Sequence, residues 1–344
     1  MPGNQPTARF QGHLAAVARP ADPVPDWLGS APVPHGIILA PDENIPWMAR
    51  SVFNPAAIVK DGKVYLLIRA EDATGAGKWF GTSRIGLAES EDGIHFTVHP
   101  EPVMGPTEPY EALGGTEDPR IIEITDPALA KSLGGQYAMT YTAFRYEEGK
   151  DGMASLALAV SDDLKRWTKK GLMLPDVKTE RNPKGWSKSG AVVPQKVNGE
   201  HLMYFGDTNI YLARSPDMLK WTVDPEPVLR PRPGYWDGIM VEPGPAPWVD
   251  EGGDIHMLYN GDAPPNGYGA GEVVFSGKSP TQVLRRSNTP MVAVSKDIGR
   301  DGQVGNVIFL EGLAHHQNKS FFYYGAADDK IAVSVADAPR RGPS

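Results

Sequence analysis

The sequence feature that most restricts the fold is a segment that recurs five times along the chain. Each copy consists of a tight turn and a following apolar strand that is rich in aromatic residues. The five copies are DGKVYLLIRAED (61–72), GGQYAMTYTAF (134–144), NGEHLMYFGDT (198–208), GGDIHMLYNGD (252–262) and NKSFFYYGAADD (318–329). Such repeats indicate structural units that stack on one another, because a single unit cannot bury its apolar face alone. Five units of similar size therefore fill the chain.

A second recurring element supports the same interpretation. IGLAESEDGIHF (85–96), LALAVSDDLKRW (156–167) and IYLARSPDMLKW (210–221) share Ala, Ser, Asp and a closing aromatic residue at one spacing. The 38 glycines and 33 prolines lie between short apolar runs, which indicates many strands and tight turns. We predict an all-β fold, a five-bladed β-propeller whose active site lies in a central funnel. The alternative is a different fold built from β-meanders with similar turns.

The repeats also predict the domain organisation. Residues 49–340 form a single propeller domain in this interpretation, and the Pro-rich residues 1–48 form an N-terminal extension that packs on it. Sheet edges and the extension could pack on their own chain or on a second copy. The sequence therefore leaves the oligomeric state undecided, with a homo-oligomer as one possibility.

Composition narrows the choice of partner. The net charge is −8 and the lysines and arginines are scattered, so the sequence carries no basic patch for nucleic acid or an anionic membrane. No apolar run reaches the roughly 20 residues of a membrane helix, and the N-terminal residues lack the apolar segment of a signal peptide. The chain contains no cysteine, which agrees with a reducing compartment. We predict a cytoplasmic protein with a neutral partner.

Polar residues recur where the innermost strand of each unit is expected to begin. In the order of the five units they are Asn54, Asp118, Lys188, Glu242 and Glu311. Innermost strands of a propeller converge on its axis, so these side chains are expected to meet in one pocket.

Asp118 and Glu242 suggest a chemistry for that pocket. Inverting cleavage of a glycosidic bond needs one carboxyl group to protonate the leaving oxygen and another to activate a water, roughly 6.5–9.5 Å away. A proline follows each acid, in EDPR and VEPG, and we expect it to hold the acid in an extended backbone at the start of a strand. The alternative is that each acid-proline step only opens a turn.

Other residues qualify as ligand contacts. Arg69 lies within an apolar run, where a charge is costly without a partner, and we predict that it contacts the ligand. Loop residues Trp186, Tyr235 and Trp236 are expected to contact either the sugar or neighbouring loops. Asp237 and Asp328 are similar cases.

Several chemistries lack their sequence signatures. His315 and His316 are adjacent and lack the spacing of a zinc site. The glycine-rich GAGKW (75–79) and GYGAGE (267–272) lack the ending of a phosphate-binding loop, and we interpret both as loops. No GxSxG motif is present. We therefore predict neither a metal nor a cofactor.

The motifs together resemble a known family. FNPAAIVKDGKVYLLIRAED, SRIGLAESEDGIHF, GGTEDPRI, KSGAVVP, VEPGPAPW and YYGAADD, in this order from about Asn54 to Asp328, resemble glycoside hydrolase family 130, the β-mannoside phosphorylases and β-mannosidases. The resemblance implies a five-bladed propeller, an inverting mechanism and a β-mannoside in the funnel.

The resemblance also implies roles for single residues. Asp118 matches the general acid of the family, which is thought to pass its proton through a mannose hydroxyl. Glu117 lies beside it. Residues that match positions around the sugar are Asn54, Arg69, Arg120 and Asp328.

Family members divide by the group that attacks the sugar. Phosphorylases carry a His-Arg-Pro run where this chain has Phe205-Gly206-Asp207, and an aspartate there would repel phosphate. Glu242 resembles the general base of the hydrolytic, β-1,2-mannoside-cleaving branch. Of the basic residues that bind phosphate in the phosphorylases, this chain keeps Lys188, and Arg181 lies near it in the sequence. We count Lys188 and Asp207 among the substrate contacts.

The sequence therefore predicts an inverting hydrolase of β-mannosides, with β-1,2-linked manno-oligosaccharides as substrates and mannose as product. Asp118 is the predicted acid and Glu242 the predicted base. One alternative is a β-mannoside phosphorylase that makes mannose 1-phosphate. The other is a propeller that binds mannosides without turnover.

Overall fold

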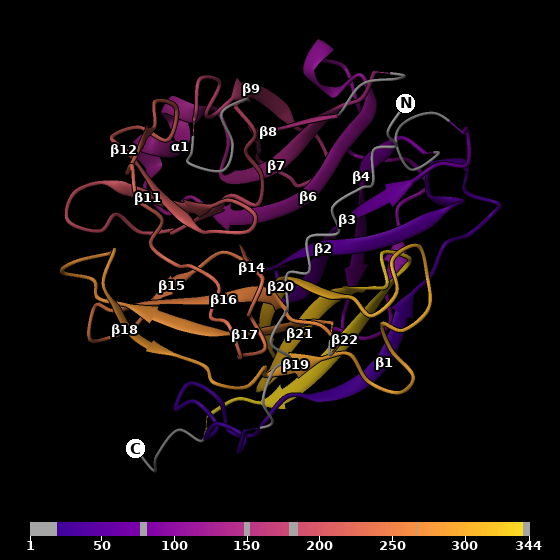
Figure 1. Cartoon of the computed structure of the whole chain (residues 1–344). Coiled ribbons are helices and arrows are strands. Elements are labelled where there is room, and N and C mark those ends of the chain that lie inside the picture. The colour runs from indigo at the N-terminus through magenta and orange to yellow at the C-terminus, as the bar shows by residue number, and fades with distance from the viewer. Residues whose placement is uncertain (1–18, 76–80, 148–151, 179–184, 266, 340–344) are drawn as a thin grey trace, which may run out of the picture.

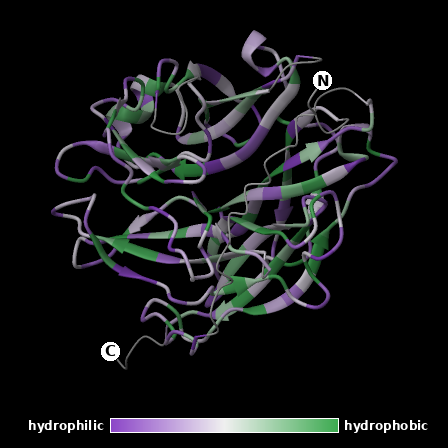
Figure 2. Ribbon diagram, in the orientation of Figure 1, coloured by the Kyte–Doolittle hydropathy of each residue, from purple (hydrophilic) through white to green (hydrophobic). Residues whose placement is uncertain are grey.

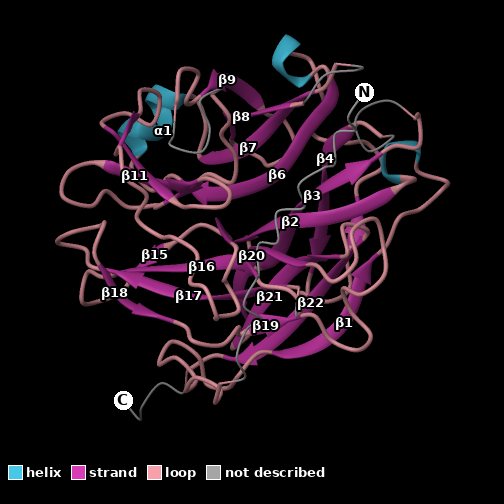
Figure 3. Cartoon of the chain, in the orientation of Figure 1, coloured by secondary structure: helices cyan, strands magenta, loops and turns pink. Residues whose placement is uncertain are grey.

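The structure is a computed structural model that describes residues 19–75, 81–147, 152–178, 185–265 and 267–339. Strands dominate it, and the helices are short (Figure 3). They are η1 (Pro46–Met48), η2 (Pro109–Glu111) and α1 (Pro127–Leu133). The predicted all-β class is confirmed. No helix in the described ranges is long and apolar enough to cross a membrane.

The first two repeats form one eight-stranded sheet that consists of two antiparallel meanders. The first meander contains β2 (Ser51–Lys60), β3 (Lys63–Glu71), β4 (Ser83–Ser90) and β5 (Thr97–Val98). The second contains β6 (Leu113–Glu123), β7 (Tyr137–Arg145), β8 (Met153–Ser161) and β9 (Thr168–Leu172). A parallel pairing of Ser83 with Gly115 joins them.

Each of the other three repeats has a sheet of its own. The third repeat contains β10 (Ala191–Val192), β11 (His201–Phe205), β12 (Tyr211–Ser215) and β13 (Thr222–Val223). The fourth contains β14 (Met240–Pro243), β15 (Trp248–Val249), β16 (Ile255–Asp262), β17 (Tyr268–Phe275), β18 (Val283–Arg286) and β19 (Val292–Ala293). The fifth contains β20 (Ile308–His316), β21 (Lys319–Ala326) and β22 (Lys330–Asp337).

The N-terminal region completes the fifth sheet. β1 (Val33–Leu39) pairs antiparallel with β22, so a strand from the expected extension 1–48 becomes the outer strand beside the C-terminal one (Figure 1). This pairing joins the two ends of the described chain.

The recurring Ser-x-Asp hairpins are turns that side chains close. Ser90 Oγ accepts the amide of Gly93, and Asp92 Oδ1 accepts the amides of Ile94 and His95. All three contacts recur after Ser161, and after Ser215 the two contacts to the aspartate, Asp217, recur. Side-chain acceptors that satisfy turn amides explain why these residues repeat at one spacing.

Apolar packing links the five units in a cycle. In the described part of the chain five buried clusters occur, and each joins two units. They join the first with the second, the second with the third, the third with the fourth, the fourth with the fifth, and the fifth with the first. Figure 2 shows the hydrophobic residues concentrated along the strands. Each sheet thus buries its faces against its neighbours, and the inner strands are left to surround a common space.

Candidate active site

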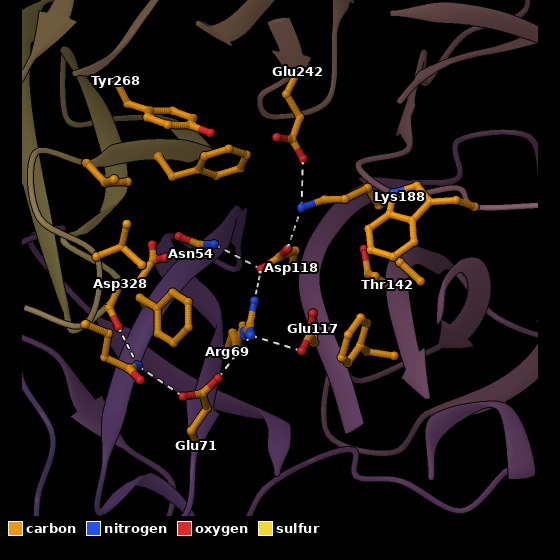
Figure 4. A pocket seen from close by; sticks show the side chains of 18 residues that line it. Asn54, Arg69, Glu71, Glu117, Asp118, Thr142, Lys188, Glu242, Tyr268 and Asp328 are labelled. Carbon is orange, nitrogen blue, oxygen red and sulfur yellow. Dashed lines mark hydrogen bonds and ion pairs between the residues drawn. The ribbon is translucent and has the colours of Figure 1, made fainter. Parts of the chain in front are cut away.

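A cavity of about 280 Å³ lies where the inner strands meet. It receives side chains from each of the five units (Figure 4). The lining residues are Phe53, Asn54, Arg69, Glu71, Glu117, Asp118, Thr142, Phe144, Ala154, Trp186, Lys188, Glu242, Tyr268, Gln303, Val304, Val307, Phe309 and Asp328.

Two β-bulges aim polar side chains into this cavity. Asn54 and Asp118 each precede a proline, and the strand register skips both pairs of residues. Their φ angles are +47° and +46°. The expectation of an extended backbone at the start of a strand is wrong for Asp118, which lies in the middle of β6. A proline has no amide to donate to a ladder, so it fits at a bulge, where the chain bends and a side chain is re-aimed.

The fifth unit leaves room for Asn54. A Cβ atom on Gly325 would lie 2.1 Å from Asn54 Oδ1, so a larger residue would displace the amide. Asn54 Nδ2 donates to Asp118 Oδ1 at 2.9 Å. The first glycine of the GAAD motif therefore helps to position the predicted acid.

Arg69 holds three carboxylates together. Its guanidinium donates to Asp118 Oδ1 at 2.8 Å and to Glu71 and Glu117 at 3.0 Å each. Its Nε donates to Ser83 Oγ at 3.1 Å. Arg69 lines the cavity as expected, but its donors point at protein groups. It therefore orients the acids rather than gripping a ligand directly.

Lys188 connects the two predicted catalytic carboxylates. Its Nζ lies 3.0 Å from Glu242 Oε1 and 3.7 Å from Asp118 Oδ2. Because both distances meet at one nitrogen, these oxygens are at most about 7 Å apart, which brings both acids within reach of one glycosidic bond. Ser189 Oγ also donates to Glu242. Figure 4 shows Lys188 between the two acids.

The environment gives the acids different proton affinities. Burial raises the pKa of Asp118, but Arg69, Lys188 and Arg120 outweigh it and hold this pKa well below its usual range. Burial raises the pKa of Glu242 against the opposing effect of Lys188. Burial likewise raises the pKa of Glu117 to about 7 and that of Asp328 to about 6, although Arg69 lowers both.

Two other predicted contacts lie beside the cavity and do not line it. Asp207 accepts a hydrogen bond from Trp186 Nε1 at 3.0 Å, so it holds a tryptophan that does line the cavity. Arg120 is 2% exposed and donates to main-chain carbonyls beneath the cavity. Arg120, predicted to lie around the sugar, therefore makes its hydrogen bonds to protein groups in this structure.

The structure does not place Trp236 and Asp237, two predicted ligand contacts, in the lining of the cavity. The Trp236 ring is buried in the apolar cluster between the third and fourth units and packs against Tyr259. Asp237 is fully buried and accepts hydrogen bonds from Arg232, Arg286 and Tyr259. These contacts belong to the interior of the fourth unit.

Sequence reasoning missed several lining residues. Glu71 ends the first repeated strand two residues after Arg69, and this same-face spacing was the available signal. Tyr268 lies in GYGAGE, which we interpreted as a loop but which is largely β17, and its hydroxyl donates to Met240 Sδ at 2.6 Å. Most of GAGKW lies outside the described residues, as does Arg181. No local signal marked Gln303.

Carboxylates outnumber cations in the lining, and the described residues contain no group of three or more His, Cys, Asp or Glu arranged to hold a metal ion. The arrangement instead offers a buried acid pair, a bridging ammonium group and aromatic walls. Such a site suits a neutral polyhydroxylated ligand.

Known proteins share this sequence and architecture. A family profile described as beta-1,4-mannooligosaccharide phosphorylase matches residues 35–339. The chain is 31% identical to a 1,2-beta-oligomannan phosphorylase of Thermoanaerobacter sp., over 87% of this chain and 94% of the relative. It is 29% identical to a beta-1,2-mannobiose phosphorylase of the same organism, with the same coverage. These names fit the phosphorylase alternative better than the predicted hydrolase.

One similar solved structure covers 94% of this chain and 98% of its own, with 30% identity and a TM-score of 0.81. Its description states that the GH130 family of mannoside phosphorylases contains glycoside hydrolases that target β-1,2-mannosidic linkages in Candida mannan. The beta-1,2-mannobiose phosphorylase of Listeria innocua shares the fold at 22% identity, a TM-score of 0.73 and coverage of 89% and 96%. With the profile match over most of its length, the chain belongs to glycoside hydrolase family 130.

Proposed function

We propose that this protein is an inverting enzyme that cleaves β-mannosides, with Asp118 and Glu242 acting on one glycosidic bond. The observation that carries the proposal is the single ammonium group of Lys188, which lies within 4 Å of both carboxylates. The acids come from β6 and β14, two different sheets, yet share one cavity. The substrates we propose are β-1,2-linked manno-oligosaccharides, because two phosphorylases with 31% and 29% identity are named for that linkage.

We also infer that the five antiparallel units are the blades of a propeller. The cyclic order of the apolar clusters supports this, since the fifth unit packs on the first. The cavity then lies on the axis. A cytoplasmic location remains a prediction.

The proton transfers follow from the charges. Glu242 takes a proton from the attacking water, and its ammonium partner favours the ionised form that this requires. Asp118 favours the ionised form before substrate binds, so it must take up a proton from solvent as the complex forms. A bound sugar displaces water, and desolvation raises a carboxyl pKa. Asp118 then donates this proton to the oxygen of the leaving sugar as the glycosidic bond breaks.

We propose water as the attacking group. A phosphate dianion needs cationic partners, and in the described residues the cations that line the cavity are Arg69 and Lys188. Arg69 is engaged by three carboxylates and Lys188 by two. Asp207 adds a further negative charge beside Lys188. Water carries no charge and meets no such repulsion.

The second candidate is phosphorolysis. The names of the curated relatives favour it, and Lys188 is a cation that a phosphate group could recruit. In that case phosphate attacks the sugar and the product is mannose 1-phosphate.

One experiment separates the candidates. The protein is incubated with β-1,2-mannobiose, with and without phosphate, and the products are identified by NMR. We expect mannose in both samples, released first as the inverted α-anomer. Mannose 1-phosphate whose formation requires phosphate would establish the second candidate. Binding without any product would indicate a mannoside-binding protein.

Variants test the two acids. Asp118→Asn and Glu242→Gln should each lower kcat for hydrolysis by about 10²–10⁴-fold, the contribution of a general acid or base. Asp224→Asn, which changes a partly buried carboxylate paired with Arg214, is the matched control and should keep full activity. A Glu242→Gln variant as active as the parent would disprove the role of the base.

A further inference from the structure

Arg120 lies beneath the cavity and binds the main chain on both sides of it. Its Nη1 donates to the carbonyl of Asp118 at 3.1 Å. Its Nη2 donates to the carbonyl of Pro243 at 2.9 Å, and its Nε donates to that of Gly244 at 3.1 Å. One guanidinium therefore reaches three carbonyls.

These carbonyls flank the two predicted catalytic acids. One belongs to Asp118 itself, and the other two directly follow Glu242 in the chain. β6 and β14 belong to different sheets. Arg120 thus links the strand that carries the acid to the strand that carries the base.

The backbone of Asp118 needs such support. Its φ of +46° is unfavourable for a residue with a side chain, and the register of β6 with β7 skips it. Strained conformations of this kind persist where surrounding groups hold them. Gly244 is also confined, because a Cβ atom there would lie 2.8 Å from the carbonyl oxygen of Leu258.

Glu311 is the acidic partner of Arg120, and burial raises the pKa of its carboxyl group well above the usual range although Arg120 lowers it. Its Oε1 lies 3.0 Å from Arg120 Nη2, and the residue is 1% exposed. Among the described residues, neither carboxyl oxygen of Glu311 has a hydrogen-bond partner of good geometry. The contact with Arg120 is therefore the polar interaction that the structure gives this buried group. Glu311 comes from a bulge of β20, so the pair brings the fifth unit to the same point.

We propose that Arg120 is a positioning residue that sets the separation and the aim of Asp118 and Glu242, with Glu311 as its acidic partner in the fifth unit. The proposal rests on the proposed function. Lysine cannot replace arginine here, because an ammonium group lacks the planar fork that reaches several acceptors at once. Misplacing a catalytic group by about 1 Å can cost about 10²-fold in rate.

The first test is Arg120→Lys, which keeps the charge beside Glu311. We expect kcat for β-1,2-mannobiose to fall by about 10²-fold while KM and the affinity for mannose, measured by calorimetry, change by less than about threefold. Arg214→Lys is the matched control, since Arg214 is a partly buried arginine paired with Asp224. It should keep the parent kcat. An unchanged kcat in Arg120→Lys, or a loss confined to KM, would overturn the proposal.

A double-mutant cycle tests whether Arg120 acts through the base. In a Glu242→Gln background, Arg120→Lys should cost much less than in the parent, because the group that it positions is already disabled. An equal loss in both backgrounds would argue for a role that does not involve Glu242. If Glu242→Gln retains the parent activity, the proposed function fails, whatever Arg120→Lys does.

Glu311→Gln is a second variant that tests the proposal even if the Arg120→Lys protein does not fold. It preserves the shape of the side chain and removes the carboxyl group that faces Arg120. We expect a lower kcat at unchanged KM, with thermal unfolding still cooperative. A folded Glu311→Gln variant with the parent kcat would count against the proposal.

Discussion

At the scale of single residues, the site is organised by a surplus of carboxylates around two cations. Asp118 lies within 4 Å of two cations, Arg69 and Lys188, whereas its neighbour Glu117 forms an ion pair with Arg69. The adjacent acids thus acquire opposite pKa shifts, because burial and the neighbouring carboxylates Asp118 and Glu71 raise the pKa of Glu117, whereas Arg69, Lys188 and Arg120 together lower that of Asp118. Environments that drive carboxyl groups apart in this way are typical of acid–base sites.

The pKa of Glu117 leads to a pH-dependent stability. Its folded-state pKa of about 7, against an ordinary value of 4.5, means that folding favours the protonated form. The stabilisation is complete below pH 4.5 and is lost as the pH rises through 7. Glu117→Gln should remove this dependence, which is on the order of 3 kcal/mol. Urea unfolding at pH 5 and pH 8 measures it, and equal pH slopes in parent and variant would contradict it.

At the scale of elements, bulges and loops decide which side chains reach the cavity. β2, β6 and β20 each carry a bulge at the polar residue that their repeat supplies. Two tryptophans in Gly- and Pro-rich loops reach opposite outcomes. Trp186 lines the cavity, and Trp236 fills the interior of the fourth unit. The sequence around them offers no signal for this difference, because the direction of a loop depends on what packs beneath it.

The two tryptophans make a matched pair of variants. Trp236→Ala should cost about 3–5 kcal/mol of stability through the cavity that it leaves, and KM should stay near the parent value. Trp186→Ala should raise KM and cost less stability, because its ring faces the cavity. Thermal unfolding and steady-state kinetics on both variants test this. A raised KM in a folded Trp236→Ala variant would show that Trp236 contributes to substrate binding.

At the scale of the whole molecule, the two ends of the described chain meet in one sheet. β1 covers the outer edge of β22, and Leu28 and Trp27 pack on the cluster between the fourth and fifth units. An uncovered strand edge exposes unpaired backbone groups and invites association. The N-terminal region therefore takes part in the architecture that surrounds the cavity.

Deleting residues 1–40 tests this closure. We expect the melting temperature to fall by more than about 5 °C and aggregation to increase, since the edge of β22 and apolar surface become exposed. The kcat of the fraction that stays folded should change little, because no residue of β1 lines the cavity. A truncated protein as stable as the full chain would show that β1 is dispensable.

The sequence by itself determined the strand-rich class, the five repeats and the polar residues that recur on or beside the inner strands, because turn residues and alternating apolar residues act locally. It therefore predicted Asn54, Asp118, Lys188 and Glu242 as members of one site. Only the tertiary structure decided that Arg120 faces main-chain carbonyls and that Trp236 is core. Those outcomes depend on packing between units distant in the chain, and no local pattern encodes which neighbour a side chain will meet.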